Sequence, residues 1–124
     1  MICLDTNFLI RALVPSSVEG TRILHWLGQG EPIGIPAIAW YEFLCGPLGP
    51  EEIQLASAIT TAGILPFGER EAEGAARLFN AVNRNRRMRV DAMIAATAIA
   101  SSARVATLNH KDFEPFVVHG LRVA

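Results

Sequence analysis

Short apolar runs alternate with longer amphipathic stretches along the chain. The runs are bounded by proline, glycine or short polar residues; Pro32 and Pro36, for example, enclose Ile33, Gly34 and Ile35. Bounded runs of this length indicate buried strands, whereas apolar residues recurring at the period of a helix turn indicate amphipathic helices. We expect strands over residues 2–4, 33–35, 64–66, 104–108 and 116–118. We expect helices over about residues 17–27, 37–45, 51–61, 69–82 and 92–103.

The order of these elements predicts the fold class. Strands alternate with helices, and a further helix is expected directly after the first strand, capped by a short polar residue of the 5–7 segment. No repeat or linker interrupts the pattern, which implies an α/β domain with a mainly parallel sheet. The helix over 92–103 is small or apolar nearly all round, so we expect it to pack closely against that sheet. Its 124 residues predict one domain over 1–124.

Composition sets limits on location and partners. No apolar run reaches the roughly 20 residues that span a bilayer, and the first residues do not resemble a secretory signal, so no membrane contact is expected. Cys3 and Cys45 both lie in apolar surroundings, which predicts buried, reduced thiols and a cytoplasmic protein. A net charge of −1 argues against strong long-range attraction to nucleic acid. Any binding of nucleic acid must therefore be local.

The aspartates stand out from the other acidic residues. The chain has only three, Asp5, Asp91 and Asp112, and they follow an expected strand or open an expected helix. In parallel sheets the ligand site lies at the carboxyl ends of the strands. Glu42 lies within about two turns of the start of its helix, so its longer side chain can reach the same edge. We therefore expect four acids from four segments to converge in one cleft.

Such a cluster indicates a cation site. Carboxylates packed together repel one another unless a cation lies between them, and Mg²⁺, with Mn²⁺ able to substitute, prefers oxygen ligands and shares its coordination with substrate phosphate. Taken singly, each acid also has a structural interpretation: Asp5 and Asp91 suit helix N-termini, Asp112 suits a turn, and Glu42 suits a solvated helix face. The joint occurrence at strand ends favours a metal site for phosphodiester hydrolysis.

Four segments together resemble a known family. They are LDTN at 4–7, YEF at 41–43, DAMIAATA at 91–98 and ATLNHKDF at 106–113. In this order and over essentially the whole chain they resemble the PIN-domain ribonucleases, most closely the VapC toxins of bacterial toxin–antitoxin pairs. The resemblance implies a three-layer α/β/α domain with a mainly parallel central sheet. It also implies a metal-dependent endoribonuclease, in which one or two ions activate a water for in-line attack on RNA.

The resemblance also assigns the acids. It implies that Asp5, Glu42 and Asp91 are the core catalytic and metal-binding residues. The fourth position stays open between two residues, because some PIN proteins carry an acid where this chain has Asn109, while many toxins carry Asn followed three residues later by Asp. We place Asp112 with the catalytic and metal-binding acids and Asn109 as a supporting polar ligand.

Further expectations follow from the same resemblance. Thr6 and Thr107 are supporting residues that orient water or the carboxylates, and Leu108 stands where Arg or Asn is frequent in toxins, which puts one substrate contact in question. The implied partners are an RNA substrate, a small VapB-like antitoxin and a second copy of the chain in a homodimer. The antitoxin is expected to bury a helix in an apolar groove and to place a basic side chain in the acid cluster.

The only basic cluster lies just before Asp91. It suits a phosphate-gripping edge that binds RNA, because arginine pairs bidentately with phosphate. A solvated helix end or a subunit contact is an equally good interpretation. The cluster consists of Arg84, Arg86, Arg87 and Arg89.

Two other classes of function remain open. A phosphoryl-receiver signalling domain has a similar length, fold and Mg²⁺ site, but it needs adjacent acids after the first strand and an Asp near mid-chain, and no Asp lies between Asp5 and Asp91. A binding module that keeps the PIN scaffold without catalysis is the other class. All four expected acids are present, which does not favour that interpretation.

Overall fold

Five parallel strands form the central sheet. Their order across it is β3-β2-β1-β4-β5, and every neighbouring pair is parallel. The strands are β1 (Ile2–Leu4), β2 (Ile33–Pro36), β3 (Gly63–Leu65), β4 (Arg104–Ala106) and β5 (Arg122–Val123). The central strand β1 is wholly buried, as a strand covered on both faces must be. The α/β class with a parallel sheet is therefore confirmed.

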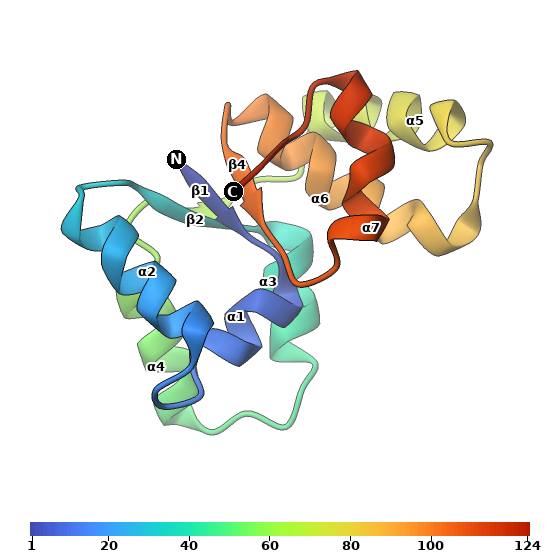
Figure 1. Cartoon of the computed structure of the whole chain (residues 1–124). Helices are drawn as coiled ribbons and strands as arrows, with labels where there is room; N and C mark the ends of the chain where they lie inside the picture. The colour runs from blue at the N-terminus through green and yellow to red at the C-terminus, as the bar shows by residue number, and fades with distance from the viewer.

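Helices cover both faces of this sheet in the computed structural model, which describes residues 1–124. Figure 1 shows α5, α6 and α7 on one side of the strands and α1, α2 and α4 on the other, which confirms the three-layer α/β/α arrangement. None of the helices has the length and hydrophobicity that a membrane span requires. The helices are α1 (Thr6–Ala12), α2 (Val18–Gly28), α3 (Ala37–Leu44), α4 (Pro50–Ile59), α5 (Glu69–Ala81), η1 (Arg86–Met88), α6 (Arg89–Ala100), α7 (His110–Phe113) and η2 (Glu114–His119).

The helix α6 is packed on several sides, as its composition predicts. It contacts α5 as well as β2 and β4, and its small side chains allow both layers to approach closely. Its buried residues are Ala92, Ile94, Ala95, Ala96, Thr97 and Ala98. The helix begins at Arg89 and ends at Ala100, earlier at both ends than the expected 92–103, because η1 runs directly into it.

Other expectations about the elements were wrong. Residues 116–118 belong to the 3-10 helix η2, in which Phe116 alone is buried, and the last strand is β5 instead. The apolar spacing within residues 17–27 predicts Ile23, Leu24 and Leu27 on one face of this helix. In α2 the core-facing residue beside Ile23 is instead Trp26, and Leu24 is 69% exposed. Cys3 is a buried free thiol as expected, but Cys45 is exposed because it follows the end of α3.

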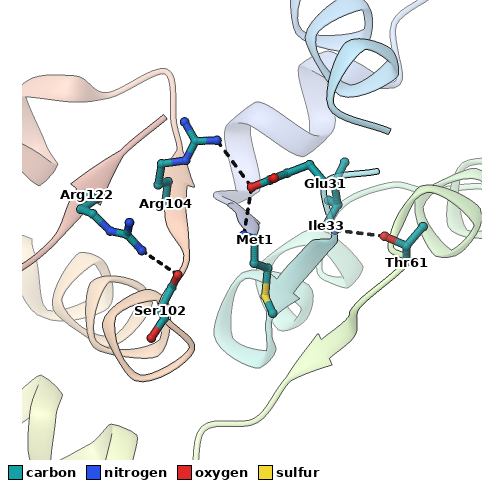
Figure 2. A network of polar contacts seen from close by, with 7 residues as sticks. All are labelled: Met1, Glu31, Ile33, Thr61, Ser102, Arg104 and Arg122. Carbon is teal, nitrogen blue, oxygen red and sulfur yellow. Dashed lines mark hydrogen bonds and ion pairs between the residues drawn. The ribbon is translucent and has the colours of Figure 1, made fainter. Parts of the chain in front are cut away.

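Polar contacts tie together the amino ends of three strands (Figure 2). The Glu31 carboxylate, just before β2, accepts from the Met1 amine at 2.9 Å and from the Arg104 guanidinium at 3.5 Å. The Thr61 hydroxyl accepts from the backbone N–H of Ile33 at 3.0 Å. These contacts lie at the amino ends of β1, β2 and β4. None of them involves a residue at the carboxyl ends of the same strands.

Candidate functional site

The four acids are carried by four different elements. Asp5 follows β1 and is the N-cap of α1, Glu42 lies on α3 after β2, Asp91 lies in the first turn of α6, and Asp112 lies on α7 after β4. Asp5 and Asp91 both experience the negative charges of Glu42 and Asp112, and Asp91 also that of Asp5. The fold thus brings Asp5 and Asp91 within reach of the charges of the other acids at the carboxyl edge of the sheet.

Asp5 is the most firmly held of the four. It is only 5% exposed, its Oδ1 accepts from the backbone N–H of Thr6 at 2.8 Å, and its Oδ2 accepts from the hydroxyl of Thr107 at 2.8 Å. The Thr107 hydroxyl also accepts from the backbone N–H of Asn109 at 3.0 Å. Thr107 therefore links the loop after β4 to the carboxylate after β1, and it fixes the orientation of that carboxylate.

A second threonine holds Glu42. The hydroxyl of Thr6 donates to Glu42 Oε1 at 2.8 Å, and the carbonyl oxygen of Ala39 lies farther from this hydroxyl, at 3.4 Å. Because Thr6 also donates its backbone N–H to Asp5, one residue at the start of α1 contacts two of the four acids. Two of the three expected supporting residues, Thr6 and Thr107, thus donate hydrogen bonds to carboxylates.

Burial and mutual repulsion make two of the carboxylates harder to ionise. The pKa of Asp91 is raised to about 6, first by burial and then by the charges of Asp5, Asp112 and Glu42. The pKa of Asp5 is also raised, chiefly by burial, although its hydrogen bonds from Thr107 and Thr6 oppose the shift. Raised carboxyl pKa values in one cleft are typical of functional sites.

These shifts predict that the metal-free protein loses stability as pH rises. The pKa of Asp91 is 3.8 ordinarily and about 6 in the folded state, so the folded state binds more protons between these values. The free energy of unfolding must then decrease across that window, by about 1 to 2 kcal/mol after allowance for partial solvent screening. Urea unfolding in EDTA at several pH values from 4 to 7 would measure this decrease in the free energy of unfolding. Asp91→Asn should flatten the decrease, and equal slopes for both proteins would contradict the assignment.

The donor set fits a hard divalent cation, although the carboxylates are spread apart. No group of three or more His, Cys, Asp or Glu side chains is placed closely enough to hold a metal ion, so the expected tight convergence is not present. Unneutralised carboxylates repel, and Glu42 is turned toward Thr6. All four acids are oxygen donors, and Mg²⁺ is commonly bound by one or two carboxylates plus water and phosphate.

The segment after β4 carries two of the expected site residues, Asn109 and Asp112. It lines a hollow of about 360 Å³ through Leu108, Asn109, His110, Lys111 and Asp112. Asn109 and Asp112 are both exposed, and the charge of Asp112 raises the pKa of Asp5 and of Asp91. Lys111, which the sequence pattern did not indicate as a site residue, lines the same hollow beside Asp112.

The basic cluster lies on the connection between α5 and α6. Asn83 and Arg84 both have positive φ, at 60° and 55°, so the chain turns sharply before η1. All four arginines are exposed, and Arg89 lies over the ring of Phe79 at 5.4 Å. None of the four forms an ion pair within the chain, so their charges remain available to a ligand.

The chain is similar in sequence and in fold to known proteins. The family model of the PIN domain matches residues 2–115. The crystal structure of FitAcB from Neisseria gonorrhoeae is similar, with a TM-score of 0.72, 26% identity, and 99% of this chain and 96% of that chain covered. A search of curated proteins gives no match.

Two further structures are similar in fold. VapBC2 from Rickettsia felis, solved bound to a DNA fragment from its promoter, has a TM-score of 0.74 and 21% identity, covering 100% of this chain and 98% of that chain. DNA-bound VapBC from Salmonella typhimurium has a TM-score of 0.75 and 20% identity, covering 99% of this chain and 96% of that chain.

Proposed function

The chain belongs to the PIN domain family, and from this premise we propose that it is a metal-dependent endoribonuclease, the toxin of a VapBC-type toxin–antitoxin pair. The observation that carries the proposal is the set of four carboxylates at one edge of the sheet, two of them held by threonine hydroxyls. Family membership removes the phosphoryl-receiver alternative. An inert PIN scaffold remains as one outcome of the tests below.

In the proposed reaction, Mg²⁺ or Mn²⁺ would neutralise the phosphate and supply an activated water. The contribution of the protein is to present oxygen ligands in fixed orientation. Asp5 and Glu42 would be held ready by Thr107 and Thr6, so little reorganisation would be needed when the ion and RNA arrive. Asp91 would add a third carboxylate. Asp112 is proposed as the fourth acid because its charge acts on Asp5 and Asp91, with Asn109 as a supporting ligand.

Cleavage of total RNA tests this proposal. The purified chain, free of antitoxin, should cut RNA at discrete positions in Mg²⁺ or Mn²⁺, and both EDTA and Asp5→Asn should abolish the cuts. Glu51→Gln is a matched control, since it removes an exposed carboxylate on α4. Calorimetric titration with Mn²⁺ accompanies the assay. A folded protein that neither cuts RNA nor binds Mn²⁺ would be an inert scaffold.

We propose that the basic cluster holds the RNA backbone. Replacing Arg86 and Arg87 together with Gln should weaken RNA binding and lower the slope of log affinity against log salt by about 1 for each lost phosphate contact. Arg11→Gln is the matched control, because Arg11 is exposed on α1, outside the cluster. Fluorescence anisotropy at several salt concentrations measures both the affinity for RNA and its dependence on salt. Unchanged affinity and slope in the double variant would leave the cluster as a solvated helix end or a subunit contact.

The proposed protein partner is a small antitoxin, as in the VapBC pairs that share this fold. An apolar hollow of about 460 Å³ lies between the α1–α2 connection and α4 and includes Leu24 and Leu55. Leu24 is largely exposed there, and an amphipathic antitoxin helix would cover it. A basic side chain of the antitoxin would then neutralise the acid cluster.

A homodimer is also proposed. Among the larger aromatic side chains, Trp26 is buried and Trp40 and Phe79 are half-buried, whereas Tyr41 on α3 is 67% exposed. Tyrosine at an exposed helix face is common in protein interfaces. Sedimentation equilibrium at micromolar concentration should give the mass of two chains, and Tyr41→Arg should shift the equilibrium toward one. A stable wild-type monomer would exclude this dimer.

A further inference from the structure

A second hollow, of about 340 Å³, lies between α5, α6 and the end of η2. None of the four carboxylates lines it. Ala96 and Ala100 on its α6 side come five and nine residues after Asp91, which places them about 8 to 14 Å farther along the helix axis. The hollow is therefore a separate feature from the acid cluster.

The α5 side of the hollow is built around a glycine. Arg70, Gly74 and Arg77 recur at helical spacing, so they share one face of α5. A Cβ at Gly74 would lie 3.5 Å from the Cβ of Ala96 and 3.8 Å from Nη2 of Arg77. The Arg77 guanidinium thus lies back over Gly74, and the missing side chain provides the floor of the hollow.

The hollow carries positive charge without a counter-charge. The ion pairs of the protein all involve Glu31, and the side chains of Arg70, Arg77 and His119 make no hydrogen bond within the chain. Three glutamates lie on the same helix, but none lines the hollow, and Glu71 is bonded to the backbone N–H of Gly68. The guanidinium groups are therefore free to bind an anion.

We propose that this hollow binds a phosphate-bearing ligand, with the phosphate between Arg70 and Arg77 over Gly74. Guanidinium groups form paired hydrogen bonds with phosphate oxygens, and two arginines can hold either a phosphomonoester, with nearly two negative charges, or a phosphodiester, with one. Half of the lining residues are hydrophobic, and Ala96 and Ala100 offer an apolar wall for a sugar or base. The volume lies within the range of small-molecule sites, roughly 300 to 1,000 Å³. The ligand is a free nucleotide or a nucleotide of an RNA strand.

Titration of the full chain in EDTA tests this without involving cleavage. The Nε–Hε signals of Arg70 and Arg77 and the amide signal of Gly74 are followed by NMR. The probes are adenosine 5′-monophosphate and, separately, a short 2′-O-methyl oligoribonucleotide without terminal phosphates. We expect saturable shifts with at least one probe and roughly tenfold weaker binding in Arg77→Gln, the loss of one charge-assisted contact. Gly74→Ala, which keeps both arginines but adds a methyl group at the base of the hollow, should also weaken binding. Arg11→Gln should leave it unchanged.

The two probes distinguish the sources of the phosphate. Saturation by the mononucleotide would identify a free nucleotide as the ligand, and saturation by the oligonucleotide alone would identify an RNA strand. A glutamate-rich peptide is titrated as a third probe, which tests for a carboxylate ligand. The proposal would be overturned by the absence of saturable shifts with both phosphate probes, by an equal loss of affinity in Arg11→Gln, or by saturation with the peptide alone. Because these signals are read without metal, failure of the nuclease proposal would not affect them.

Discussion

Asp91→Asn is expected to reduce RNA cleavage by about 10³-fold while the protein stays folded. Removing one group that stabilises charge in a transition state commonly costs 10²- to 10³-fold in rate, and Asp91 would also be a metal ligand. Its side chain makes no hydrogen bond within the chain, so the amide breaks no existing contact. The pKa of about 6 shows that the ionised carboxylate is disfavoured in the metal-free fold, so the amide should also make the metal-free protein no less stable at pH 7.

Two measurements on the same preparations check this result. Single-turnover cleavage in Mn²⁺ gives the loss of rate, and thermal unfolding in EDTA gives the change in stability. Glu51→Gln, which removes an exposed charge from α4, should leave the cleavage rate within about twofold of the wild type, as expected of a surface substitution. Near-normal cleavage by a folded Asp91→Asn protein would exclude Asp91 from the catalytic set.

Phe113→Ala is expected to have the largest effect on stability. Phe113 is fully buried, packs edge-on against Phe116 at 6.4 Å between ring centroids, and directly follows Asp112. Truncation of a buried phenylalanine removes apolar burial and leaves a cavity, which typically costs about 3 to 5 kcal/mol. Because Phe113 anchors α7, its loss should also release Asp112 from its place beside the other acids.

Urea unfolding at equilibrium measures this cost. Val118→Ala is a suitable control, because Val118 is 82% exposed on the adjoining η2 and its truncation should cost less than about 0.5 kcal/mol. A loss below about 1 kcal/mol in Phe113→Ala would mean that the segment after Asp112 is not anchored as described. In that case the position of Asp112 beside the acids would also be in question.

The fold could be predicted where burial shapes the local sequence. Ile2, Cys3 and Leu4 form a continuous apolar run because β1 is covered on both faces. The two-residue strand β5 leaves no such signal, since Arg122 is exposed and Val123 is half-buried. Residues 116–118 carry the β-branched composition of a strand, yet the chain there is a 3-10 helix that ends at His119. It is followed by Gly120 as the C-cap, whose φ of 107° suits glycine. Local composition therefore could not show that residues 116–118 form a helix and that Arg122 and Val123 form the last strand.

For the candidate site, the sequence could indicate which acids lie at strand ends, because an acid after an apolar run is visible locally. It could not show how those acids are oriented. The hydrogen bond from Thr107 to Asp5 joins residues 102 positions apart, and the bond from Thr6 to Glu42 joins residues 36 positions apart. Such contacts depend on the order of the strands. The exposure of Cys45 and of Leu24 likewise depends on which helices pack beside them.

The strand order has a consequence for synthesis of the protein. The central strand β1 is made first, but one of its two neighbours, β4, comes about a hundred residues later, and that later segment supplies the hydroxyl that holds Asp5. A ribosome-bound chain that still lacks this segment can fold its earlier elements, because folding proceeds from the N-terminus during translation. It cannot assemble the acid site. A nuclease built in this way would be harmless to the ribosome that makes it until the last quarter of the domain has emerged.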